Sequence, residues 1–169
     1  MNEPTIRVVT EADTPALAKL LNEIIAIGGT SALEEALAPN WLADAMLTGP
    51  GVICCFVAED GEGALAGFQS VTSSDYLPAD VGDVGTFTRV GRVQRGTGSR
   101  LFEATKKAAR GAGLSAINAT IRADNEGGLA FYTRMGFVDH NVERAIPLRS
   151  GLIVDRIRKR FSLRTLVGV

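Results

Sequence analysis

Apolar residues at the start of the chain change from a strand-like to a helix-like spacing. Residues 5–9 predict a short first strand. A helix should follow, with Thr10 as its N-cap and Asp13 as the capping-box partner. Gly28 and Gly29 should end this helix, because glycine is favoured where a helix stops. Its core-facing positions recur at helical spacing and are Leu17, Leu20, Leu21, Ile24 and Ile25.

The middle of the chain predicts one more helical region and three strands. The helical region covers about residues 32–47 and is broken near Pro39, because proline interrupts a helix. The elements expected after it are a strand at 52–58, a hairpin turn at 59–63, a strand at 64–72, a loop at 73–82 and a strand at 83–90.

The last part of the chain predicts two helices and three strands. A glycine-rich segment, residues 91–98, leads into a helix, and Asp124 or Asn125 caps a second helix that ends at Met135 and Gly136. The expected strands are 115–121 and two more between 137 and 161, around a turn at 149–151. The order β-α-α-β-β-β-α-β-α-β-β implies a mixed sheet with helices on both faces.

Composition narrows the class of protein. The chain has 169 residues, 46% hydrophobic, and a formal net charge of −1, which suits one folded domain and disfavours general binding to nucleic acid or anionic membranes. No apolar run is long enough for a membrane span, and the first residues lack the features of a secretory signal. We therefore expect a cytoplasmic protein.

Histidine and cysteine are too few for the usual metal chemistry. The chain has one histidine, His140, and two adjacent cysteines, Cys54 and Cys55, in an apolar strand. Neighbouring strand residues point to opposite faces, so these thiols are poorly placed to bridge each other. A zinc site needs about four such ligands, so we expect no metal.

The glycine-rich segment before the first C-terminal helix suits a phosphate group. Backbone N–H groups at a helix N-terminus attract anions, and glycines allow close approach. Arg92, Arg95 and Arg100 add positive charge. A P-loop is excluded because Thr97 stands where lysine is required, and a dinucleotide fingerprint lacks its third glycine near Leu101.

A second segment gives this loop a more specific meaning. Arg95-Gly96-Thr97-Gly98 is followed by Asn125, Tyr132 and Gly136-Phe137 in order. This arrangement resembles the GNAT superfamily of acyl-CoA-dependent N-acetyltransferases, which carry [QR]-x-x-G-x-[GA] and then Asn-x6-Tyr-x3-Gly-Phe. One departure is Val93, which occupies the first loop position, where Gln or Arg is usual.

The resemblance implies a fold and a subgroup. The fold is an α/β (α+β) GNAT domain over residues 1–169, with about seven mostly antiparallel strands and a splayed V between strands 4 and 5. Asn22, the segment at 30–35 and the last hairpin, with Arg144-Ala145, Gly151 and Asp155, are most similar to phosphinothricin and L-amino-acid N-acetyltransferases.

The resemblance also implies roles for individual residues. Acetyl-CoA is the expected co-substrate, with its pantetheine along strand 4 and its pyrophosphate on the glycine loop. The expected contacts are Thr88, Val90, Val93, Gln94, Arg95, Gly96, Thr97, Gly98, Ser99, Arg100, Asn125 and Tyr132. Tyr132 is the candidate general acid for the departing thiolate, because a phenol can donate a proton in a dry site.

The base and the acceptor contacts stay open at the level of sequence. Asp83, at the start of strand 4, is one candidate base, and Glu34 or Glu35 near the acceptor side is the other. An acceptor carboxylate could meet Arg89, or Thr86 and Thr88.

The acceptor itself also stays open. The sequence favours transfer to the primary amine of a small molecule, an amino acid or an analogue. The alternatives are a protein or peptide amine, or a non-catalytic acyl-CoA-binding module. The basic run at 156–160 is interpreted as an edge strand whose charges block pairing, and as a contact of a homodimer, which the resemblance also implies.

Overall fold

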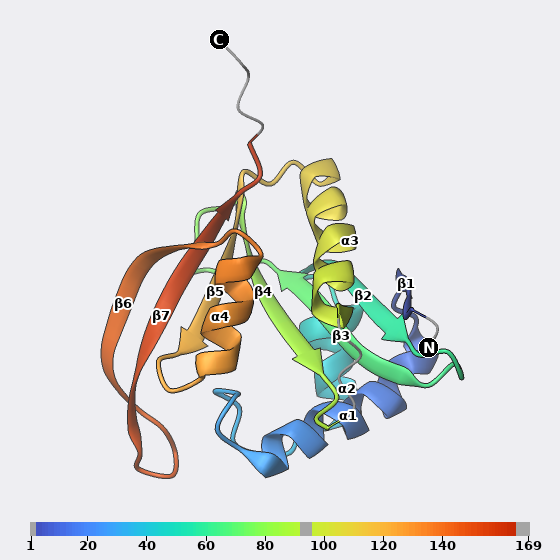
Figure 1. Cartoon of the computed structure of the whole chain (residues 1–169), viewed down its shortest axis with the longest axis horizontal. Coiled ribbons are helices and arrows are strands. Elements are labelled where there is room, and N and C mark those ends of the chain that lie inside the picture. The colour runs from blue at the N-terminus through green and yellow to red at the C-terminus, as the bar shows by residue number, and fades with distance from the viewer. Residues whose placement is uncertain (1–2, 92–95, 165–169) are drawn as a thin grey trace.

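Seven strands form one mixed sheet in the computed structural model, which describes residues 3–91 and 96–164 (Figure 1). The strand order is β1-β2-β3-β4-β5-β7-β6, and every neighbouring pair is antiparallel except the parallel pair β4–β5. This confirms the predicted fold class. The strands are β1 (Thr5–Val8), β2 (Val52–Glu59), β3 (Leu65–Thr72), β4 (Val81–Thr88), β5 (Ala116–Arg122), β6 (Val138–Pro147) and β7 (Ile153–Ser162).

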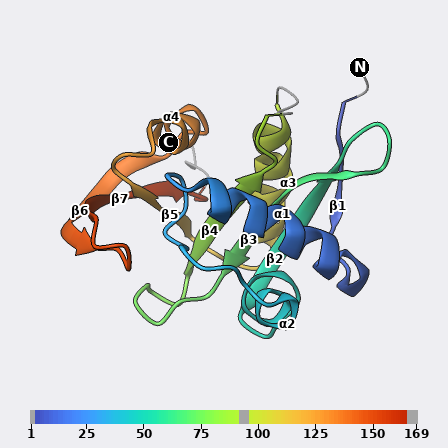
Figure 2. The ribbon, with the colours of Figure 1, turned by 90° about the horizontal axis from the view of Figure 1, so that it is seen from below.

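Helices cover both faces of this sheet, as Figure 2 shows. On one face lie α1 (Thr14–Ile27) and α2 (Pro39–Leu42), which continues into a π-helical turn at Ala43–Leu47. On the other lie α3 (Thr97–Gly111) and α4 (Glu126–Arg134). Each face has its own apolar core, because alternate strand residues point to opposite sides. Phe68 and Val57 join the α1 side, whereas Val71, Ile117 and Ala119 join the α3 side.

The expected helix at 32–47 is wrong in its first half. Residues 30–38 are irregular, and the helix begins only at Pro39. Proline lacks an N–H group and forces the preceding residue into an extended conformation, so it suits the first helical position. Ala38 accordingly has φ −70° and ψ 141°. Asn22 holds the end of the irregular stretch, because its amide exchanges hydrogen bonds with both backbone groups of Leu37, at 3.0 and 2.8 Å.

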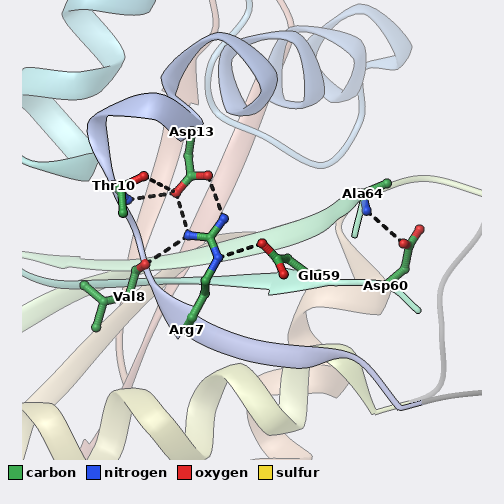
Figure 3. A network of polar contacts seen from close by, with 7 residues as sticks. All are labelled: Arg7, Val8, Thr10, Asp13, Glu59, Asp60 and Ala64. Atoms are coloured by element: carbon green, nitrogen blue, oxygen red, sulfur yellow. Dashed lines mark hydrogen bonds and ion pairs between the residues drawn. The ribbon is translucent and has the colours of Figure 1, made fainter. Parts of the chain in front are cut away.

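A charged network joins β1, β2 and the start of α1 (Figure 3). The backbone N–H of Thr10 donates to Asp13 Oδ2 at 2.8 Å, which confirms the predicted capping-box pair, although the first turn, Glu11–Asp13, is a 3-10 helix. Arg7 donates two hydrogen bonds to Asp13, at 2.8 and 2.7 Å, and one to Glu59 at 2.6 Å. The hydrogen bonds from Arg7 outweigh the cost of burial and lower the pKa of Asp13 to about 2.

The basic run at 156–160 lies inside the sheet, so its interpretation as an edge strand is wrong. It belongs to β7, which pairs with β5 on one side and with β6 on the other. The edge strand is β6, and its charged and polar residues are largely exposed. The sequence does not distinguish the two strands, because both carry many charges. The chain forms the edge strand β6 first, and β7 then pairs between β6 and β5.

Strands β4 and β5 separate soon after they meet, as predicted. Their ladder contains only three pairs, Val81 with Ala116, Gly82 with Ile117 and Asp83 with Asn118. Beyond Asp83 the two strands diverge, which is visible in Figure 1. The predicted strand 83–90 is displaced along the chain, because β4 starts at Val81 and ends at Thr88. Asp83 and Asn118 therefore stand at the vertex of a V within the sheet.

Candidate active site

The V presents different side chains on its two faces. Val84 and Thr86 of β4 point towards α3 and α4, where Val84 joins the core that contains Tyr132 and Thr86 contacts the Tyr132 hydroxyl. Asp83 belongs to the opposite set, because side chains alternate along a strand. Phe87 of that set packs in the core formed with α1 and α2. A group lying in the V could thus be reached from both sides of the sheet.

Tyr132 enters this region from α4. Its hydroxyl lies 2.8 Å from Thr86 Oγ1, which also accepts a hydrogen bond from Gln69 Nε2 at 2.8 Å. The ring meets Phe131 and Phe137 edge-on, at centroid distances of 5.0 Å. Burial raises the pKa of Tyr132 to about 12. The phenol is therefore protonated at neutral pH and is held beside the middle of β4.

Asp83 is held at the vertex by two donors from separate parts of the chain. Asn118 Nδ2 donates to Asp83 Oδ1 at 2.9 Å, and the Tyr76 hydroxyl donates to Asp83 Oδ2 at 2.6 Å. Arg160 Nε donates to Asn118 Oδ1 at 3.0 Å, which fixes the orientation of that amide. The guanidinium of Arg158 lies over the Tyr76 ring, 4.9 Å from its centroid. Asp83 is thus a carboxylate in a defined position, with a tyrosine at one of its oxygens.

Sequence analysis missed Tyr76, Asn118 and Arg158. A signal was present for Asn118, because it lies between Ile117 and Ala119 in a strand whose other face is apolar. The alternation of Asn118, Thr120 and Arg122 indicates one polar face of β5. No local signal distinguishes Tyr76, which lies in the loop before β4.

Glu34 and Glu35 contact the turn between β6 and β7. The Glu34 carboxylate accepts hydrogen bonds from the backbone N–H groups of Arg149 and Ser150, and Glu35 pairs with the Arg149 guanidinium. Burial alone would raise the pKa of Glu34, but these N–H groups outweigh it and lower the pKa. Glu34 is therefore a weak proton acceptor here, and it links the segment after α1 to the last hairpin.

The first turn of α3 carries the part of the glycine loop that the structure describes. Gly96 precedes α3 with φ +91°, a left-handed conformation that favours glycine. A Cβ atom at Gly98 would lie 2.7 Å from the Phe131 ring, so α3 and α4 approach closely there. Thr97 is buried, Ser99 follows within the helix, and Arg100 pairs with Glu3. The expected contacts Val93, Gln94 and Arg95 lie outside the described residues.

The other expected contacts are spread along β4 and α4. Asn125 caps α4, since its Oδ1 accepts from the Gly128 N–H at 2.9 Å, while its Nδ2 donates to the Thr30 carbonyl at 3.2 Å. Thr88 ends β4, and Val90 beyond it is 56% exposed.

Arg89 points away from this region. It donates to the Leu65 carbonyl at 2.7 Å and lines a surface hollow of about 570 Å³ beside Arg7 and Lys19. The alternatives predicted to bind an acceptor carboxylate are Arg89, or Thr86 with Thr88. Of these residues, Thr86 contacts Tyr132.

Comparison with known proteins decides the family. Residues 19–137, well over half of the chain, match the model of the acetyltransferase (GNAT) family. The chain belongs to the GNAT family. This confirms the resemblance stated from the glycine loop and Tyr132. A search of curated proteins finds no match for the chain.

Several solved acetyltransferase structures share the fold over nearly their whole length. A GNAT superfamily phosphinothricin acetyltransferase from Sinorhizobium meliloti, in complex with acetyl-CoA, is 18% identical with a TM-score of 0.84, covering 99% of this chain and 96% of its own. The yncA protein from Salmonella typhimurium, with its cofactor acetyl-CoA, is 16% identical with a TM-score of 0.82, covering 99% and 98%. Ribosomal-protein-alanine N-acetyltransferase from Brucella melitensis is 21% identical with a TM-score of 0.82, covering 94% and 99%. At these identities the likeness establishes the GNAT fold.

Two further observations concern membranes and metals. Within residues 3–91 and 96–164, no helix has the length and apolar character that crossing a bilayer requires. In the same part of the chain, no cluster of three or more His, Cys, Asp or Glu side chains could hold a metal ion.

Proposed function

We propose that this GNAT protein transfers the acetyl group of acetyl-CoA to the primary amine of a small molecule, an amino acid or an analogue. The observation that carries the proposal is the protonated Tyr132 hydroxyl, held 2.8 Å from Thr86 beside the V. The acetyl-CoA complexes of the S. meliloti and S. typhimurium proteins support the choice of co-substrate. The S. meliloti protein also supports an amino-acid-like acceptor.

In the proposed reaction the amine nitrogen attacks the thioester carbonyl carbon directly. The C–N bond forms first and gives a tetrahedral intermediate, with no covalent acyl-enzyme. When this intermediate collapses, the C–S bond breaks and the Tyr132 hydroxyl gives its proton to the departing thiolate. Asp83, on the other face, takes a proton from the amine, directly or through water. The proton lost by the amine ends on Asp83, and the thiolate takes one from Tyr132. The cycle closes when the proton on Asp83 passes through water to the Tyr132 phenolate, so that both groups return to their starting states.

The pyrophosphate is assigned to the segment 93–100. The support is the N-terminus of α3, where backbone N–H groups have no intrahelical acceptor and the helix dipole favours anions. Thr88, Val90 and Asn125 are assigned to the pantetheine, along the edge of β4 that leaves β5. Glu34 is retained as the alternative base, although its hydrogen bonds to the last hairpin make Asp83 the stronger choice.

The second candidate function is acetylation of a protein or peptide amine. It is favoured by the structural likeness to the B. melitensis ribosomal-protein-alanine N-acetyltransferase. A non-catalytic acyl-CoA-binding module is the third, and the buried Tyr132 hydroxyl argues against it.

The assembly and the compartment are also proposals. We assign a homodimer in which the last hairpin contributes to the contact, supported by its exposed apolar side chains at Val138, Leu152 and Ile153. The free cysteines suit a reducing cytoplasm.

The deciding experiment measures thiol release from acetyl-CoA with a panel of amines and an acceptor-free control. The panel contains L-amino acids, phosphinothricin, polyamines and short peptides. Saturable release with free amino acids supports the proposal, and release with peptides alone supports the second function. Binding of acetyl-CoA without release above the control would leave only the binding module.

A further inference from the structure

We infer that the face of β5 and β7 on the Asp83 side binds an anionic group of the acceptor, a carboxylate or a phosphinate, through Arg156 and Arg158. The inference rests on the proposed function, because it concerns the molecule that approaches Asp83. It assigns the acceptor's anionic group to two residues that neither the family assignment nor the sequence prediction gives this role.

Strand register places a row of polar and basic side chains on one face. Arg156, Arg158 and Arg160 of β7 lie directly opposite Arg122, Thr120 and Asn118 of β5. Directly paired residues of antiparallel strands project to the same face. That face is the Asp83 side, because Asn118 donates to Asp83 and Arg122 donates to the Ser31 carbonyl in the segment after α1. The row therefore begins at the vertex of the V and runs away from it.

The middle of the row is open to the outside. Thr120 is exposed although it lies in an interior strand, whereas its neighbour Ala119 on the opposite face is fully buried. Helices α1 and α2 lie under β2 to β4, and Figure 2 shows the segment after α1 reaching towards β5. The loop before β4 also reaches this face, because the Tyr76 ring lies 4.9 Å from the Arg158 guanidinium. A small molecule can thus approach Thr120, beside Arg158 and the Tyr76 ring that covers part of its guanidinium.

The guanidinium groups around this opening are not fully neutralised by the protein. Arg122 pairs with Asp124 at 2.7 Å, and Arg158 pairs with Glu143. Within the part of the chain that the structure describes, Arg156 has no ion pair, and the buried Nε atoms of Arg156 and Arg158 have no hydrogen-bond acceptor. A buried cationic donor without an acceptor is costly. An anionic group bound against the accessible part of the two guanidinium groups would offset this cost through its charge.

The spacing also suits a small acceptor. Along β5, Thr120 is two residues and Arg122 four residues from Asn118, about 7 and 13 Å at the rise of a strand. Long arginine side chains can lean back over part of this span. One acceptor molecule of the size of glutamate or phosphinothricin could then place its amine at Asp83 and its anionic group at Arg158 and Arg156.

The test compares acceptors that differ only in charge. Glutamate and glutamine have the same amine and nearly the same shape, and phosphinothricin replaces the side-chain carboxylate by a phosphinate. We would measure kcat/KM with each acceptor for the wild type, Arg156→Gln and Arg156→Lys. Lys107→Gln is the control, because it removes one positive charge from the exposed surface of α3. Circular dichroism and acetyl-CoA binding verify that each variant is folded.

The inference predicts that the wild type prefers glutamate or phosphinothricin over glutamine, and that Arg156→Gln lowers kcat/KM for the anionic acceptors tenfold or more. Glutamine should change little, Arg156→Lys should retain part of the preference, and Lys107→Gln should retain all of it. If kcat/KM falls more for glutamate than for phosphinothricin in Arg156→Gln, the site binds a carboxylate, and the opposite order indicates a phosphinate. Equal use of glutamate and glutamine, or a preference that survives in Arg156→Gln, would overturn the inference.

A binding measurement separates this outcome from the proposed function. Calorimetric titration of the CoA complex with glutamate and glutamine needs no chemistry. Binding of glutamate that depends on Arg156, without acetyl transfer, would refute the proposed function and keep the anion site. Acetyl transfer to other amines, with equal binding of glutamate and glutamine, would keep the proposed function and refute the anion site.

Discussion

Replacing Tyr132 by phenylalanine removes one oxygen atom from a closely packed site and tests the proton donor directly. The ring keeps its contacts with Phe131 and Phe137, and Thr86 keeps its hydrogen bond from Gln69. Loss of the hydrogen bond to Thr86 should cost about 1 kcal/mol of stability. The variant is therefore expected to fold, and a change in turnover will report on the hydroxyl.

Whether Tyr132 can protonate the leaving thiolate depends on the pKa values of the phenol and of the thiol that forms. A thiol in water has a pKa of about 8.5, so a phenol with a pKa of about 12 could not give up its proton easily to an exposed thiolate. Burial changes this comparison. Inside this protein, desolvation raises the pKa of Cys54 to about 11 and that of Cys55 to about 12. Desolvation acts in the same direction on a thiolate that leaves in a dry site, so it narrows the difference between its pKa and that of Tyr132.

We expect kcat for Tyr132→Phe to fall by between about tenfold and a thousandfold. A hydrogen bond to a charged group, about 1.5–3 kcal/mol, corresponds to about 10–150-fold, and general acid catalysis contributes about 10²–10⁴-fold. KM for acetyl-CoA should change little. The assay is thiol release with a saturating acceptor from pH 6 to 10, and the phenol stays protonated throughout that range. Turnover within twofold of the wild type at every pH would refute the assignment.

Three further predictions test other parts of the structure. Asp83→Asn should lower kcat tenfold or more near pH 7 and recover towards pH 10 as the amine loses its proton unaided; a loss that is constant with pH would argue against a base. Asp13→Asn should cost about 1–2 kcal/mol at pH 7, reduced from the full pKa difference because Arg7 is a third exposed. The folded pKa of Asp13 is lowered, so this stability exists above pH 4 and is lost towards pH 2; urea denaturation should show a smaller loss of stability between these values in the variant. Gly98→Val should raise KM for acetyl-CoA severalfold, because its Cβ meets the Phe131 ring at 2.7 Å and displaces the first turn of α3; an unchanged KM would show that this turn does not hold the nucleotide.

The sequence predicted the parts of the fold that depend on local pattern. The first turn of α3, the Thr10–Asp13 pair and the helix α4 that carries Tyr132 all follow from residues within a few positions of one another. The helix predicted at 32–38 is absent although Leu33, Ala36 and Leu37 recur at helical spacing, because Pro39 starts a helix here instead of breaking one. The network around Asp83 was invisible for another reason. It joins Tyr76, Asn118 and Arg160 through the register of β4, β5 and β7, which no local pattern encodes.

The short ladder between β4 and β5 has a consequence for how the protein should respond to its ligand. Three residue pairs are the direct backbone connection between the two strands, while beyond Asp83 the edge of β4 facing β5 has no ladder partner among the described residues. An extended ligand that hydrogen-bonds along this edge would act as a missing strand. Amide hydrogen exchange should then slow at alternate residues of β4 when acetyl-CoA is added, and the apparent stability should rise with its concentration. The amides along this edge of β4 would therefore report both the binding of acetyl-CoA and the local stability of the sheet.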